Sequence, residues 1–165
     1  MTDPLSPLLH QTWPHQSECM TYYGNPYRAG WLHANTVDVP CPWQLYYGET
    51  PVEHILIHHK CAPSLVRILN YIWAECDNDA DRISALHYDW FSGSYNLRPI
   101  RGGTHISMHG FACAIDFDAQ ENPFHSTHHK FQPTDLIVRA FEAEGWTWGG
   151  RWRSPDAMHF QAARL

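Results

Sequence analysis

The order of helix-like and strand-like segments is the feature that most constrains the fold of this chain. Apolar residues recur at helical spacing between residues 64 and 76 and again between 134 and 144. Strand-like segments lie at 52–59, around 87–97, at 112–118 and at two places near the C-terminus. This order lacks the regular alternation of strand and helix that builds a parallel sheet. The pattern therefore predicts an α+β fold with a mainly antiparallel central sheet flanked by helices.

The N-terminal part of the chain has a different character from the rest. A length of 165 residues leaves room for one compact domain. Residues 1–50 are rich in proline and aromatic residues and show neither helical nor alternating periodicity. We expect irregular chain that wraps around a core formed by residues 51–165. Its aromatic side chains are interpreted as anchors to that core, with a role in lining a substrate groove as the alternative.

Charge and composition exclude several classes of partner. The net charge of −6 has the wrong sign for binding nucleic acid through counterion release. No apolar run approaches the roughly 20 residues of a membrane span, so membrane insertion is not expected. The first residues, MTDPLSPLLHQTWP, lack the basic and then apolar pattern of a signal peptide, which predicts cytoplasmic synthesis without classical export. The oligomeric state is open, with a monomer as the default.

One cluster of polar residues has the pattern of a metal site. The segment SMHGFACAID, residues 107–116, is followed about forty residues later by DAMH, residues 156–159. Zinc in hydrolases usually has three protein ligands drawn from His, Asp and Glu, and keeps a fourth position for water. His109, Asp116 and His159 supply that number, and we predict that they hold one Zn²⁺. The alternative is that they are ordinary polar residues at strand ends.

Two further residue types would complete a hydrolytic site. Asp156 lies three residues before His159 and is placed to act as a general base that does not itself bind the metal. Arg98 or Arg101 could balance the negative charge that develops on an attacked carbonyl. Asp156 could instead cap a turn, and Arg98 could form a surface ion pair, with Arg101 or Arg151 in its place.

Other candidates near the cluster have weaker patterns. Ser107 is interpreted as a hydrogen-bond partner of the site rather than a nucleophile, because no Ser-His-acid arrangement surrounds it. Trp148 and Trp152 are interpreted as core aromatic residues that stiffen the metal site, with walls of a substrate cleft as the alternative. Asp118 and Glu121 could attract a second cation such as Ca²⁺, but a solvated acidic loop is the expectation.

The pattern SxHxxxxAxD followed by a late acid-x-x-His resembles the zinc peptidases of peptidoglycan. These include D-alanyl-D-alanine carboxypeptidases and dipeptidases, and L-alanyl-D-glutamate endopeptidases of the phage endolysin type. The resemblance runs from about Val52 to the C-terminus, through IHHKCAPSL, SYNLRPIRGG, SMHGFACAIDFD, EGWTWGG and DAMHFQ. It implies zinc held by the three ligands above, Asp156 as base and Arg98 on the scissile carbonyl. It also implies a fold shared with lysostaphin-type peptidases and hedgehog domains.

The same resemblance implies a function. The expected activity is hydrolysis of an amide in the peptide stem of peptidoglycan. The L-alanyl-D-glutamate bond is the first choice, because an aspartate in the base position is more like the endopeptidase branch, and the D-alanyl-D-alanine bond is the alternative. The expected setting is a phage or prophage lysis enzyme that reaches the cell wall after release. A zinc-stabilised binding module without catalysis is the alternative from another class, and a closed four-ligand site would favour it.

The chain departs from the family pattern at one position. Family members usually have glycine three residues after the first histidine, and here this residue is Ala112, with Gly110 two residues earlier. If the position requires a positive φ, the turn between His109 and Asp116 must be built differently.

Overall fold

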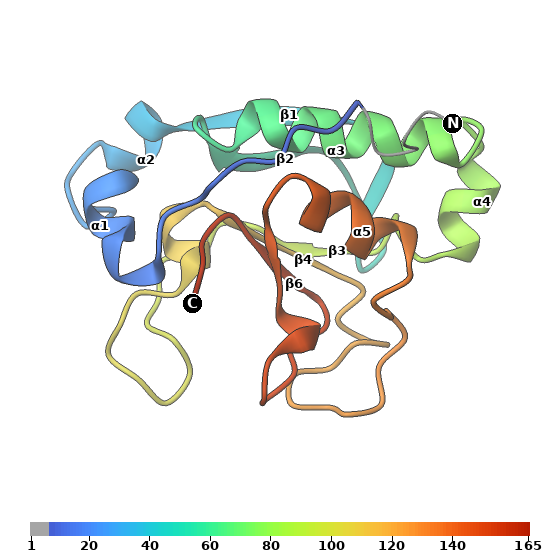
Figure 1. The fold of residues 1–165 in the computed structure, drawn as a ribbon. Coiled ribbons are helices and arrows are strands. Elements are labelled where there is room, and N and C mark those ends of the chain that lie inside the picture. Colours follow the sequence, from blue (N-terminus) through green and yellow to red (C-terminus); the bar gives the residue numbers. More distant parts are fainter. Residues whose placement is uncertain (1–6) are drawn as a thin grey trace.

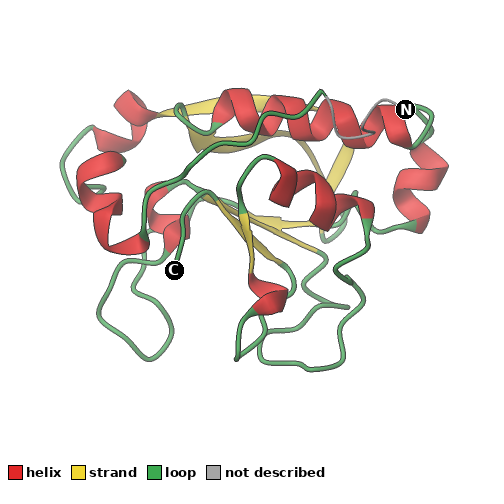
Figure 2. Ribbon diagram, viewed as in Figure 1, coloured by secondary structure: helices red, strands yellow, loops and turns green. Residues whose placement is uncertain are grey.

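The computed structural model describes residues 7–165, which form two antiparallel sheets and the helices around them (Figures 1 and 2). One sheet is a two-stranded hairpin, β1 and β2, and the other has four strands in the order β3-β4-β6-β5. Helix α3 packs on the hairpin, and α5 lies between α3 and the four-stranded sheet (Figure 1). This arrangement confirms the predicted α+β fold with an antiparallel sheet.

The hairpin joins the N-terminal region to the rest of the protein. Strand β1 (Thr36–Tyr47) pairs with β2 (Thr50–His58) along most of its length, with a shift in register between Pro40 and Leu45. The strand expected at 52–59 is confirmed. Irregular structure was expected up to residue 50, and this prediction is wrong for 36–47. The prolines of β1 lie where the ladder is interrupted, a position that tolerates proline because a bulge removes the need for its N–H.

Short helices precede the hairpin. They are η1 (Gln16–Glu18), α1 (Cys19–Tyr22) and α2 (Trp31–Asn35). The expected boundary between residues 50 and 51 falls at the start of β2, within the hairpin. The signal-peptide interpretation rests partly on residues 1–6, which lie outside the described residues. Within the described part of the chain, none of the helices combines the length and apolar character needed to cross a bilayer.

The two predicted helices form where their apolar stripes indicated. Helix α3 spans Ala62–Glu75 and buries one face of leucine and isoleucine, while α5 spans Leu136–Ala143. Gly145 follows α5 with a φ of +83°, and a side chain there would collide with the carbonyl of Gln11. The six-residue helix α4 (Ala80–Ala85) was not predicted, because it is too short to show a helical stripe.

The four-stranded sheet contains the strands predicted in the second half of the chain, each of them short. They are β3 (Phe91–Gly93), β4 (Ala114–Phe117), β5 (Thr147–Trp148) and β6 (His159–Gln161). Strand β4 lies between β3 and β6 and is antiparallel to both. Its register places Asp116 directly opposite His159. The sheet therefore brings together two residues that are 43 positions apart in the sequence.

A buried carboxylate ties three parts of the fold together. Glu144, at the end of α5, is fully buried. Its oxygens accept hydrogen bonds from the Leu9 amide at 2.7 Å, the Ser64 hydroxyl at 2.8 Å and the Arg67 guanidinium at 2.8 and 2.9 Å. Its backbone carbonyl accepts a hydrogen bond from the indole of Trp13 at 3.0 Å. This group links the N-terminal segment, α3 and α5.

Candidate metal centre

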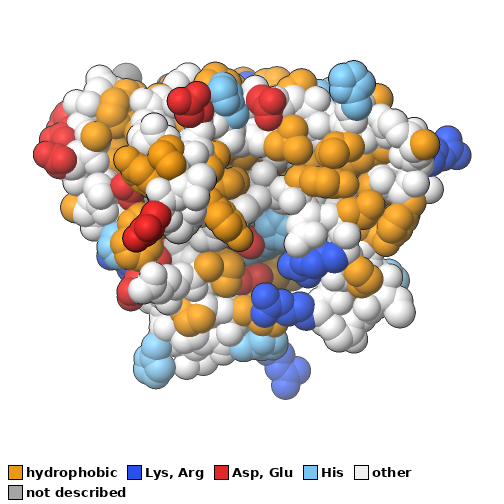
Figure 3. All heavy atoms as spheres, turned by 180° about the vertical axis from the view of Figure 1, so that it is seen from behind, with side chains coloured by type: hydrophobic (Ala, Val, Ile, Leu, Met, Phe, Trp, Pro, Cys, Tyr) orange, Lys and Arg blue, Asp and Glu red, His pale blue; other side chains and the backbone are white. Residues whose placement is uncertain are grey.

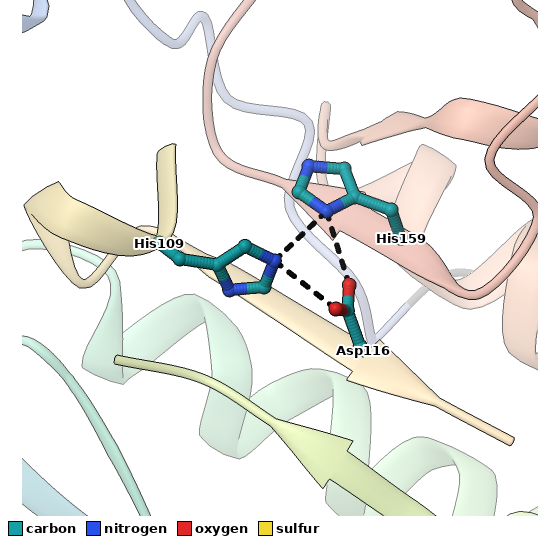
Figure 4. A group of neighbouring side chains, drawn as sticks. All are labelled: His109, Asp116 and His159. Carbon is teal, nitrogen blue, oxygen red and sulfur yellow. Dashed lines mark hydrogen bonds and ion pairs between the residues drawn. The ribbon is translucent and has the colours of Figure 1, made fainter. Parts of the chain in front are cut away.

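The side chains of His109, Asp116 and His159 converge at one end of the four-stranded sheet (Figure 4). His109 Nε2 lies 3.2 Å from one Asp116 oxygen, and His159 Nδ1 lies 3.0 Å from the other. The two imidazole nitrogens are 3.1 Å apart. One potential ligand atom from each residue lies within 4.8 Å of the others, and among residues 7–165 no further His, Cys, Asp or Glu joins the group.

Short backbone elements hold each of these side chains. His109 lies in the 3-10 helix η2 (Met108–Phe111), which is capped by the Ser107 hydroxyl accepting a hydrogen bond from the His109 amide at 3.3 Å. Ala112 ends η2 in the left-handed conformation, with φ at +52°. The position does take a positive φ, so alanine adopts here the conformation for which glycine is favoured. The chain then enters β4, which carries Asp116.

Hydrogen bonds behind the histidines determine which ring nitrogen faces the group. His109 Nδ1 lies 2.6 Å from the carbonyl of Ser94, so this nitrogen carries the proton and Nε2 presents a lone pair. His159 Nε2 lies 2.9 Å from Gln161 Oε1, which leaves Nδ1 as the free nitrogen. The Gln161 amide in turn donates to the Ala163 carbonyl at 3.1 Å. Both imidazoles are therefore oriented as metal ligands usually are.

Sequence reasoning missed both of these supporting residues. Gln161 had a usable signal, because it lies two residues after His159 on a predicted strand and so shares its face. Ser94 offers only its backbone carbonyl, which no sequence pattern marks.

The electrostatics of the group fit a cation. Burial would raise the pKa of Asp116, but its close contacts with His109 and His159 lower it well below its usual value. Burial would lower the pKa of His159, but its contacts with Asp116 raise it instead. A partly buried carboxylate between two imidazoles is stabilised by positive charge beside it. Two nitrogen donors and one oxygen donor, with lone pairs directed at one point, are a donor set that zinc accepts.

Asp156 lies in the same cavity as the three converging side chains. Its Oδ1 is buried and has no hydrogen-bond partner among the described residues, and burial raises the pKa of the carboxyl group. Its backbone is held by a hydrogen bond from its amide to the Gly149 carbonyl at 2.9 Å. A side chain on Gly149 would clash with the Asp156 carbonyl, so glycine is needed for this close approach.

Both candidate arginines reach the site from the loop before η2. Arg98 and Arg101 line the cavity that contains Asp156. The Arg98 guanidinium donates to the Pro99 carbonyl at 3.2 Å, whereas the Arg101 guanidinium lies 5.0 Å from the centre of the Phe124 ring. The charge of Arg101 also lowers the pKa of Asp156, against the larger effect of burial. The choice between the two arginines stays a prediction.

The weaker candidates are in different environments. Trp152 lines the cavity, and its ring centre lies 5.5 Å from that of His159. Trp148 is almost fully buried and donates to the Ala157 carbonyl at 2.8 Å, so it is a core residue and not a cleft wall. Ser107 lines the cavity in addition to capping η2.

Asp118 was expected in a solvated loop, and this prediction is wrong. Its side chain is buried, one oxygen lies 2.9 Å from His87 Nδ1, and the other accepts a hydrogen bond from the Glu121 amide at 3.2 Å. The carboxylate thus has protein partners on both oxygens, and Glu121 contributes its backbone rather than its side chain to this contact.

Fold and site together define a small α+β protein with a His-Asp-His group suited to a metal ion. Residues 101–162 match the sequence model of a family described as D-alanyl-D-alanine carboxypeptidase. The matched segment contains the three converging residues and Asp156 but begins after Arg98. The match confirms the resemblance to the zinc peptidases of peptidoglycan and indicates a hydrolase. Searches of curated proteins and of solved structures found no match to this chain.

Proposed function

We propose that this protein is a zinc peptidase that hydrolyses an internal amide in the peptide stem of peptidoglycan, with the L-alanyl-D-glutamate bond as its substrate. The observation that carries the proposal is the His109–Asp116–His159 group, in which hydrogen bonds to Ser94 and Gln161 direct a lone pair of each imidazole to one point. A group of three protein ligands leaves a coordination position for water, as in catalytic zinc sites.

The residues around this group have distinct tasks in the proposed reaction. When bound, zinc supplies Lewis acidity and lowers the pKa of water to about 7. Asp156 accepts a proton from the attacking water and passes it to the departing amine, which is the work of a general base followed by a general acid. Asp156 lines the same cavity as the three candidate ligands, which is the position that a general base needs.

The arginine completes the chemistry. Arg98 is the residue we assign to the scissile carbonyl, where its fixed positive charge offsets the charge that develops on the oxygen. Arg101 lines the same cavity and is the alternative for this task. The setting that we propose, lysis of a bacterial cell wall by a phage or prophage enzyme, is supported by the resemblance to endolysins.

A second candidate is favoured by the description of the matched family. A D-alanyl-D-alanine carboxypeptidase would use the same metal group and the same base on the terminal bond of the stem. The two candidates differ in the bond and not in the chemistry. A binding module without catalysis is disfavoured by the three-ligand group and by the Asp156 oxygen that has no partner within residues 7–165, because a purely structural site needs neither.

The experiment is a digestion of purified peptidoglycan with the zinc-loaded protein and with the chelated protein, followed by mass analysis of the new termini. We expect zinc-dependent release of new termini at L-alanyl-D-glutamate bonds. Release of free D-alanine would support the carboxypeptidase instead. Zinc binding without new termini under any metal condition would remove the peptidase proposal and leave the binding module.

A further inference from the structure

Two cavities meet at the candidate metal centre. The smaller, of about 320 Å³, lies on the side of Asp156 and Trp152, and the larger, of about 620 Å³, lies on the side of the β1–β2 hairpin. Both volumes are in the range of small-molecule sites. Arg98, Arg101, His109, Asp116 and Met158 line both cavities. Two of the three candidate ligands, His109 and Asp116, therefore stand where the cavities meet, and His159 lines the smaller one.

The larger cavity has two walls of different chemistry. One is the segment 91–96, which includes β3 and offers serine and asparagine side chains as well as backbone groups. The other is formed by Tyr47 at the end of β1 and Leu56 in β2. The same segment also contributes the rings of Phe91 and Tyr95, so the cavity offers both polar groups and apolar surface. Such a mixed lining suits a peptide in extended form, whose amides need hydrogen bonds and whose small side chains need apolar contact.

Seen from behind, the molecule is hollowed near the centre of the face that Figure 3 shows. Apolar side chains border the hollow, and side chains of Lys or Arg lie along its lower edge in that view. Arg98 and Arg101 line both cavities, so positive charge is available beside the reacting bond. A glutamyl residue within a peptide keeps one free carboxyl group, and this charge complements the arginines.

We propose that the hairpin residues Tyr47 and Leu56 form the wall of a substrate subsite, and that the stem peptide passes through both cavities, so that the bond cleaved is an internal one. The proposal rests on the proposed function. Tyr47 and Leu56 lie outside the segment 101–162 that matches the family model. The exposed position of Tyr47, at 59% of its surface, leaves its ring free to contact a ligand.

The first test concerns the ends of the substrate. A synthetic stem peptide that is blocked at both ends is incubated with the zinc-loaded protein, beside the same peptide with a free C-terminus. We expect cleavage of both at the same internal bond, because each cavity accepts part of the chain. Cleavage that requires the free C-terminus would overturn the two-sided groove and favour the carboxypeptidase, while zinc-dependent peptide hydrolysis itself would still be supported.

The second test concerns the hairpin wall. In Tyr47→Ala, KM for the intact stem peptide should rise roughly 5- to 30-fold with kcat little changed, the factor expected when one large apolar contact is lost. Tyr46→Ala is the matched control, because Tyr46 is the adjacent tyrosine, is 38% exposed, and lines neither cavity. Leu56→Ala should follow Tyr47→Ala, and circular dichroism shows whether each variant is folded.

The outcomes of the two tests separate the proposals. Wild-type protein that cleaves no stem peptide would contradict the proposed function and the subsite together. Wild-type cleavage with the same KM in Tyr47→Ala and Tyr46→Ala would overturn the subsite alone. A KM effect of Tyr47→Ala that disappears when the peptide is shortened on one side would support the subsite and show which side of the bond it binds.

Discussion

Glu144 and Asp156 are both acidic residues with carboxyl oxygens removed from water, but the protein surrounds them differently. The Glu144 oxygens accept hydrogen bonds from a backbone amide, a hydroxyl and a guanidinium. Asp156 keeps one buried oxygen without any partner in the described part of the chain. Arg67 supplies a countercharge to Glu144 at 2.8 Å, whereas no ion pair of the described residues involves Asp156.

This difference separates a structural group from a reactive one. A buried carboxylate with all its hydrogen bonds made contributes to the specificity and stability of the fold, while one that lacks a partner costs free energy. Such a cost is usually retained only where the group has a chemical task. Changes at Glu144 should therefore affect stability, and changes at Asp156 should affect activity.

The largest expected effect is on catalysis by Asp156→Asn. Loss of the general base should lower kcat on the stem peptide by about 10²- to 10⁴-fold. Zinc should remain bound, because Asp156 is not among the converging ligands. The free energy of unfolding should stay the same or increase, since a neutral amide avoids the cost of burying a charge. Steady-state kinetics, zinc analysis and urea denaturation measure the three quantities, and loss of zinc would contradict the assigned role.

Glu144→Ala should affect stability rather than catalysis. Removing the buried carboxylate leaves Arg67 and Ser64 without their partner and should lower the free energy of unfolding by about 3 to 5 kcal/mol. Glu142→Ala is the control, because Glu142 forms a more exposed ion pair with Arg151 and should change stability by less than about 1 kcal/mol. Urea denaturation compares the two. Similar losses of unfolding free energy in both variants would show that the Glu144 hydrogen bonds contribute no more to stability than an exposed ion pair does.

The hydrogen bond between His159 and Gln161 should affect metal binding, in contrast to the hydrogen bonds of Glu144, which should affect stability. Gln161→Leu removes the acceptor of the His159 ring proton and should weaken zinc binding by about 10- to 100-fold. Gln161→Glu keeps an acceptor at this position and should bind zinc at least as well as the wild type. Competition with a chromophoric chelator measures both dissociation constants without reference to activity. Equal zinc affinity of Gln161→Leu and the wild type would contradict the role of Gln161 in positioning His159.

Sequence patterns predicted the elements whose signals are local. The apolar stripes of α3 and α5 indicated both helices, and the spacing of His109 and Asp116 indicated a turn followed by a strand. Each of these depends on neighbours within a few residues. The convergence of His159 with them was expected from its late strand and from the family resemblance, which carries information about the whole fold.

Features that depend on packing were not visible in the sequence. Strand β1 was hidden by Pro40, because the bulge that tolerates proline is created only by pairing with β2. The burial of Asp118 follows from its contact with His87, 31 residues earlier in the chain. The hairpin residue Tyr47 could not be connected with the metal centre, because only the folded arrangement places both beside one cavity.

His58 is a buried histidine away from the metal centre, and its titration should make the stability of the protein depend on pH. His58 Nδ1 accepts a hydrogen bond from the Lys60 amide at 3.1 Å, and Nε2 lies 3.1 Å from the Tyr23 carbonyl, so both ring nitrogens have backbone partners in the neutral form. Burial, against the hydrogen bond to Tyr23, lowers the pKa of His58 to about 4.

The sign of the resulting pH effect follows from linkage. The unfolded chain takes up the proton near the ordinary histidine pKa of about 6.5, well before the folded protein does. Stability from His58 is therefore complete above about pH 6.5 and declines as the pH falls toward 4. Urea denaturation from pH 7 to 4 should show a weaker decline in His58→Gln, whose amide does not titrate. Parallel curves for the two proteins would contradict this assignment.

The smallest expected effect is that of Ala112→Gly, which restores the residue that the family usually has. Relief of the left-handed conformation should stabilise the protein by about 1 to 2 kcal/mol. Loss of a buried methyl group costs about 0.8 kcal/mol, and the greater freedom of glycine in the unfolded chain costs a further 0.5 to 1 kcal/mol. These contributions nearly cancel, so the free energy of unfolding should change by less than about 1 kcal/mol, with zinc affinity unchanged. Ala112→Val is the contrast, because a β-branched residue is poorly tolerated at positive φ and should destabilise the protein clearly. Equal stability of the valine and glycine variants in urea denaturation would show that the backbone at this position is not held in the left-handed conformation.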